Sequence, residues 1–155
     1  MKKPFLILML ISVVIISISF AVNADSDTTS SEKKVEDCPE ASDLLDTTIY
    51  DRDVVVETLK TLIPETYING DEYGEYYSDW SIITARPLPM TIGDSVNDVY
   101  FEIAKNFCGK EVANKSWLIR LNFPKWEGVS DSNMESQIFM AKSKDKGWYL
   151  WYRYH

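Results

Sequence analysis

The chain has 155 residues, and its 16 Lys and Arg side chains are outnumbered by 24 Asp and Glu, which gives a formal net charge of −8 at pH 7. This acidic balance argues against a nucleic-acid-binding protein, because phosphate neutralisation needs clustered Lys and Arg. It also argues against adhesion to an anionic membrane surface. A basic partner, a cation or an uncharged ligand fits the charge better.

Residues 1–24 have the pattern of a cleavable signal peptide. Lys2 and Lys3 form a basic start, an uncharged apolar run follows, and small residues precede a polar stretch. Cleavage after Ala24 would leave 14 basic against 24 acidic residues, a formal net charge of −10. We therefore expect an extracytoplasmic protein, either periplasmic or secreted.

An uncleaved N-terminal anchor is the alternative, because the apolar run approaches the ~20 residues that can span a bilayer. Two features argue against it. No positive charges follow the run to hold an anchor in place, and no Cys follows directly that could carry a lipid. The membrane is a partner only if this segment stays uncleaved.

Residues 41–155 are predicted to form a single domain, preceded by an acidic tail at 25–40 that is too polar to bury a core. The chain contains two cysteines, Cys38 and Cys108. In an oxidising compartment such a pair is best explained as a disulfide, which would tie the tail to the domain. A redox role is not expected, because C-x-x-C spacing is absent.

Two amphipathic helices are predicted. The first covers 51–63, and Pro64 is expected to end it because a proline disfavours the helical conformation of the residue before it. The second begins at Asp94 or Ser95 and ends at Gly109, which suits a left-handed cap. The apolar face of the second helix is expected to hold six residues: Val96, Val99, Tyr100, Ile103, Phe107 and Cys108.

Four strands are predicted. Residues 80–86 form the first, which is closed by two prolines. Apolar and polar residues alternate from 116 to 123, which is typical of a half-buried strand. Two further strands, 137–143 and 148–154, are joined by a hairpin loop at 144–147.

The predicted class is α+β, with two helices packed on an antiparallel sheet of about four strands. The elements run in the order helix, strand, helix and a three-strand meander, and we expect both helices to cover one face of the sheet. This order is similar to that of cystatin-like and NTF2-like folds, in which a curved antiparallel sheet wraps a helix and can enclose a pocket. The similarity lies in the order of elements alone.

The residue inventory argues against several kinds of catalysis. His155 is the one histidine and the last residue, where chains are commonly frayed, so a histidine relay is not expected. Multi-histidine zinc centres are excluded, and thiolate zinc sites need more than two cysteines. The glycine-rich phosphate-binding motifs are absent as well. We expect no cofactor and no metal.

Carboxylate chemistry remains open in the aromatic and acidic stretch 67–79, which contains Asp71, Glu72, Glu75 and Asp79. Two of these carboxylates could act as an acid/base pair in a small pocket enzyme. A calcium loop is a further alternative, although aromatic residues stand where the EF-hand template requires oxygen ligands. An irregular cation site and a solvated loop are the remaining interpretations.

Aromatic residues gather near the C-terminus. On the last strand, strict alternation would point Tyr149, Trp151 and Arg153 to the same face. If the helices cover only the other face, this row and Trp126 form a candidate binding surface, because Tyr, Trp and Arg are enriched at binding hot spots. The alternative is that loops, the tail or a second protomer bury the row.

Two functions follow as hypotheses. The favoured one is an exported, non-catalytic binding or accessory module, which uses the aromatic strand face and the acidic loop against a protein or uncharged ligand. The other is a small hydrolase-like enzyme working through the loop carboxylates. The sequence leaves the oligomeric state open, and the sequon at Asn114 matters only if the host glycosylates.

Overall fold

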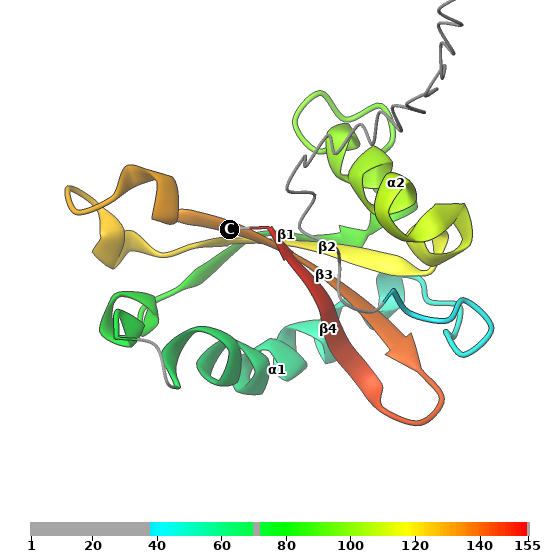
Figure 1. Cartoon of the computed structure of the whole chain (residues 1–155), viewed down its shortest axis with the longest axis horizontal. Coiled ribbons are helices and arrows are strands. Elements are labelled where there is room, and N and C mark those ends of the chain that lie inside the picture. Colours follow the sequence, from blue (N-terminus) through cyan, green and yellow to red (C-terminus); the bar gives the residue numbers. More distant parts are fainter. Residues whose placement is uncertain (1–37, 70–71, 155) are drawn as a thin grey trace, which may run out of the picture. The chain divides into compact units, whose positions relative to one another are not determined.

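The computed structural model describes residues 38–69 and 72–154 of the chain. Its helices are α1 (Arg52–Ile63) and α2 (Asp98–Asn114). Its strands, in chain order, are β1 (Ser81–Pro87), β2 (Ser116–Asn122), β3 (Glu135–Ser143) and β4 (Gly147–Tyr154). The strands form one antiparallel sheet in the order β1-β2-β3-β4 (Figure 1). The predicted α+β class, with two helices and a four-stranded antiparallel sheet, is confirmed.

The predicted signal peptide (1–24), the first part of the predicted tail (25–37) and His155 lie outside the described residues. Within the described residues, no helix is long and apolar enough to cross a membrane. Signal cleavage and export therefore stay predictions.

Helix α1 forms because one side of it is apolar at helical spacing. Val55, Leu59 and Ile63 are fully buried along this side. The α-helix ends at Ile63, but the chain continues through Pro64–Ile68 as a π-helical stretch. Ile63 keeps a helical conformation (φ −65°, ψ −49°) although a proline follows it, so Pro64 ends the α-helix without ending the helical run. The N–H of Asn69 then donates to the carbonyl oxygen of Pro64 at 3.0 Å.

The two helices lie on opposite faces of the sheet, so the expectation that they share a face is wrong. Trp117 and Ile119 of β2 belong to the core under α1, whereas Leu118 packs with Phe101 of α2. Figure 1 shows α2 above the sheet and α1 below it. Strand β2 is therefore buried on both faces instead of half-buried.

Helix α2 begins at Asp98, later than expected, and buries only part of the expected face: Tyr100 and Ile103 pack against the core under α2. Phe101 and Ala104 are its buried contacts, while the side chains of Val96, Val99 and Phe107 are 58%, 51% and 43% exposed. The apolar residues of this segment spread over more than one side of the helix, so spacing alone does not choose the buried side.

Gly109 interrupts α2 but does not end it as a left-handed cap, because its ψ is 161° and the helix runs on to Asn114. Its φ of 85° lies in the region that favours glycine, and the chain then makes a last helical turn at 110–114. Cys108 therefore sits at the end of the straight part of the helix.

A bulge in β4 changes the direction of the aromatic row. Leu150 pairs with Met140 and Tyr152 pairs with Phe139, so Trp151 is an extra residue in the ladder. Tyr149 lies before the bulge, opposite Ala141 on the α2 face, and Trp151 lies on the same face.

Beyond the bulge the alternation is reversed. Arg153 pairs with Ile138, whose side chain belongs to the core under α1. The expected single-faced row of Tyr149, Trp151 and Arg153 does not exist, because the first two lie on the α2 face and Arg153 lies on the other.

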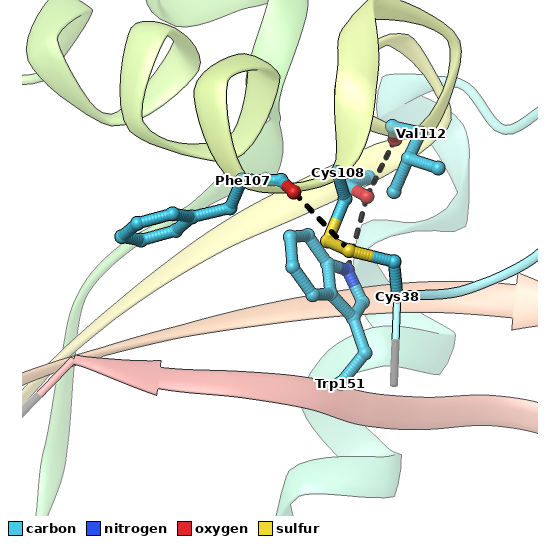
Figure 2. The surroundings of a disulfide bond; sticks show 6 residues. Cys38, Phe107, Cys108, Val112 and Trp151 are labelled. Atoms are coloured by element: carbon cyan, nitrogen blue, oxygen red, sulfur yellow. Dashed lines mark hydrogen bonds between the residues drawn. A yellow bond between two sulfur atoms is a disulfide. The ribbon is translucent and has the colours of Figure 1, made fainter. Parts of the chain in front are cut away.

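The disulfide predicted between Cys38 and Cys108 is present, with a Cα–Cα distance of 5.3 Å (Figure 2). It fixes the first described residue to the end of the straight part of α2. The segment that follows is also held, because Lys115 Nζ donates to the carbonyl oxygens of Ala41 at 3.0 Å and Leu44 at 3.1 Å. Leu44 is buried and forms a β-bridge with Ser143.

Removing the disulfide should lower stability substantially. The two cysteines are 70 residues apart in sequence, and closing such a loop in the unfolded chain corresponds to about 4 kcal/mol. We expect the Cys38→Ser/Cys108→Ser variant to lose roughly this amount in urea unfolding. A loss below about 1 kcal/mol would show that the segment from Cys38 is not part of the cooperative unit.

Candidate functional site

The acidic loop exposes its described carboxylates. Glu72, Glu75 and Asp79 are all exposed, and Asp71 lies outside the described residues. None of the three lines either of the hollows described below. Neither of these two hollows therefore brings any of the three carboxylates together.

The aromatic residues of this loop pack on Trp126, which is only 4% exposed. Its ring stacks on Tyr76 with 4.7 Å between centroids and meets Tyr77 edge-on at 5.3 Å. Trp126 thus supports the acidic loop from the core side, and a direct role in binding stays a prediction.

Arg153 lies on the α1 face, beside Tyr67. Its guanidinium is 4.9 Å from the ring centroid of Tyr67 and donates to the carbonyl oxygen of Thr66 at 3.4 Å. Burial raises the pKa of Tyr67 to about 12, and its hydroxyl is hydrogen-bonded to Ser136 Oγ. Arg153 is therefore held against the helical stretch after α1 while remaining exposed to solvent.

Trp151 lies under α2, close to the disulfide (Figure 2). Its indole Nε1 donates to Ser116 Oγ at 3.0 Å, and Ser116 Oγ donates to the carbonyl oxygen of Val112 at 2.7 Å. The ring also packs against Phe139, with 5.3 Å between centroids. Trp151 is half-buried and joins β4 to the start of β2 and the last turn of α2.

Tyr149 is the one residue of the predicted row that lines a hollow. This hollow, of about 240 Å³, lies between the N-terminal segment and the β3–β4 hairpin. We name it the Tyr149 hollow; its lining residues are Cys38, Pro39, Glu40, Asp43, Ser143, Asp145, Lys146 and Tyr149.

Backbone hydrogen bonds hold the two walls of the Tyr149 hollow together. The N–H of Leu45 donates to the carbonyl oxygen of Lys142 at 2.8 Å. The N–H of Lys144 donates to the carbonyl oxygen of Asp43 at 3.2 Å. With the disulfide on the other side, these bonds place residues 38–45 against the hairpin. The hollow is therefore formed before any ligand arrives.

The side chains that line the Tyr149 hollow carry more negative than positive charge, and the ammonium groups of Lys144 and Lys115 bond to the backbone of Ser42 and Leu44 beside it. Three carboxylates (Glu40, Asp43, Asp145) line it against the single ammonium group of Lys146, which lies 5.4 Å from the ring centroid of Tyr149. Burial raises the pKa of Tyr149, and the charge of Asp43 raises it further. The phenol is therefore neutral at neutral pH and presents its ring face to positive charge.

A second hollow, of about 280 Å³, lies at the start of α2; we name it the α2 groove. Apolar side chains of Ile92, Val99 and Phe101 line it together with the carboxylates of Asp98 and Glu102.

Asp94 organises the turn that carries this groove. Its carboxylate accepts hydrogen bonds from Asn97 Nδ2 at 2.9 Å and from the N–H of Val96 at 3.0 Å, and it pairs with the guanidinium of Arg86. These interactions, the Asn97 hydrogen bond above all, lower the pKa of Asp94 to about 2. Arg120 adds a bond to Asn97 Oδ1 at 3.1 Å, so the turn is connected to β2.

The carboxylates of both hollows were not identified from the sequence. A partial signal existed for the first, because the disulfide and the hairpin loop place Glu40 and Asp145 near Tyr149. Within residues 38–69 and 72–154, no group of three or more His, Cys, Asp or Glu could hold a metal ion.

The hydrogen bond between Trp151 and Ser116 should be measurable as a coupling. Trp151→Phe removes the indole donor, and Ser116→Ala removes its acceptor. We expect a coupling free energy of about 1 kcal/mol in a double-mutant cycle followed by urea unfolding. Additive effects of the two substitutions would contradict this role for Trp151.

The contribution of Asp94 to stability should depend on pH. Its pKa in the folded protein is lowered to about 2, so its contribution is complete above the unfolded value near 4 and is lost as the pH falls from there toward 2. We expect Asp94→Asn to unfold at lower urea concentration than the wild type at pH 7, and the difference to close between pH 4 and pH 2. A difference that does not change with pH would contradict this assignment.

Comparison with protein-family models, with curated proteins and with solved structures finds no match for this chain.

Proposed function

We propose that this chain is a small exported binding module that recognises a basic group of a protein partner, without catalysing a reaction. The observation that carries the proposal is the Tyr149 hollow, where one aromatic ring and three carboxylates surround a preformed space. Cations are bound in proteins by this combination, an aromatic face for the charge and carboxylates for hydrogen-bonded pairing.

Lys146 shows how a cation fits the hollow. Its ammonium group already lies over the ring of Tyr149. Since Lys146 is exposed on a hairpin loop, a ligand cation can displace it at little cost. A single exposed cation–π contact contributes about 0.5–1 kcal/mol, so one basic side chain binds weakly and the remaining affinity must come from a larger surface.

A partner of protein size would supply that surface. The exposed Glu72, Glu75 and Asp79 precede β1, at the far end of the sheet from the β3–β4 hairpin (Figure 1). Only a partner of protein size can contact both these carboxylates and the Tyr149 hollow. The predicted acidic charge of the mature chain favours a basic partner through long-range attraction.

The alternative of a small hydrolase-like enzyme has no observation in its favour. Its carboxylates would have to face each other across a pocket, about 5 to 10 Å apart. Glu72, Glu75 and Asp79 are exposed and line neither hollow.

The proposal is tested by titrating the protein with a short capped peptide that contains two arginines and following amide chemical shifts by NMR. We expect millimolar binding, with shifts centred on Tyr149, and at least a threefold loss of affinity in Glu40→Gln/Asp43→Asn. Both side chains are exposed, so the variant should keep its fold.

The matched control is Glu72→Gln/Glu75→Gln, which removes the same charge from the far end of the sheet. It should bind the peptide as the wild type does. Equal losses in the two variants would mean that only overall charge matters, and the Tyr149 hollow would then not be the recognition site.

A further inference from the structure

Four large apolar side chains are exposed within the ten residues from Met90 to Val99, which lead into α2. Met90, Ile92, Val96 and Val99 are 52%, 61%, 58% and 51% exposed. Single exposed apolar residues are ordinary, but a group of them beside a hollow is typical of an interaction site. Ile92 and Val99 line the α2 groove itself.

The turn that presents these side chains is rigidly held. The Asp94 carboxylate joins Arg86, Val96 and Asn97. Thr91 is buried and donates its hydroxyl to the carbonyl oxygen of Leu88 at 2.7 Å. A surface fixed in this way loses little conformational entropy when a partner binds to it.

The charges around the α2 groove define the chemistry of its occupant. Asp98 and Glu102 line it, and they are one helical turn apart on α2. Glu102 forms an ion pair with Lys105, with 2.8 Å between Oε2 and Nζ. Asp98 makes no ion pair within residues 38–69 and 72–154. An apolar floor beside two carboxylates is complementary to an apolar side chain flanked by Lys or Arg.

We propose that the α2 groove is a second docking surface, which binds a short basic amphipathic segment of a protein partner. An apolar anchor of that segment packs on Ile92, Val99 and Phe101, and a Lys or Arg one turn away pairs with Asp98. A second copy of this chain is a poor occupant, because the chain carries a net charge of −8 and would bring like charges together. The site is separate from the Tyr149 hollow and does not depend on it.

The test uses a designed 14-residue helical peptide of Leu and Lys and its counterpart of Leu and Glu, each titrated into the mature protein and followed by NMR. We expect the Leu–Lys peptide to shift the amides of Ile92, Val99 and Glu102 and to bind at least tenfold more tightly than the Leu–Glu peptide. The affinity should fall at least tenfold in Ile92→Ser/Val99→Ser. It should fall at least threefold in Asp98→Asn/Glu102→Gln.

Two controls separate this site from the rest of the molecule. Val54→Ser/Val129→Ser makes the same polar change at two exposed valines elsewhere and should bind as the wild type does. Glu40→Gln/Asp43→Asn, which removes charge from the Tyr149 hollow, should leave the shifts at Ile92 and Val99 unchanged. The two variants therefore distinguish loss of peptide binding at the α2 groove from loss of binding at the Tyr149 hollow.

Three outcomes would overturn the proposal. Equal affinity of the wild type and Ile92→Ser/Val99→Ser for the Leu–Lys peptide would remove the groove as the site. Concentration-dependent dimerisation that this variant abolishes would make a second copy the occupant. A tenfold gain of peptide affinity in Lys33→Gln/Lys34→Gln, without such a gain in the charge-matched control Lys60→Gln/Lys125→Gln, would mean that the chain's own residues before Cys38 occupy the groove.

Discussion

The burial of the central strands on both faces is the constraint on which the rest of this structure depends. Trp117 and Ile119 of β2 face α1, and Leu118 faces α2, all with no exposed surface. The molecule therefore has one hydrophobic core on each face of the sheet, and each core is covered by a different helix (Figure 1).

The bulge at Trp151 determines the face of the sheet on which the last side chains of β4 lie. It allows the indole to reach Ser116 beneath the end of α2, near the disulfide (Figure 2). It also turns Arg153 to the α1 face, where the guanidinium lies over Tyr67. The aromatic strand is therefore mainly an internal connector, and Tyr149, before the bulge, is the residue of this strand that borders an acidic hollow.

Both proposed docking surfaces rely on polar groups that fix an otherwise irregular segment. Lys115 and the disulfide hold residues 38–45 beside Tyr149, and Asp94 holds the turn before α2. In each case carboxylates stand at the edge of a preformed hollow. The chemistry that we propose for both is recognition of positive charge next to an apolar or aromatic contact, which fits the acidic composition of the chain.

By itself the sequence determined the local elements and the pairing of the cysteines. Helical spacing located α1, alternation located β2, and two cysteines left Cys38 and Cys108 one possible intramolecular partner. Only the tertiary structure decided which side of α2 is buried, where β4 bulges, and which carboxylates meet around Tyr149. Periodicity describes the sides of one element, whereas these three features depend on contacts between residues far apart in the chain, such as Trp151 with Ser116 and Lys144 with Asp43.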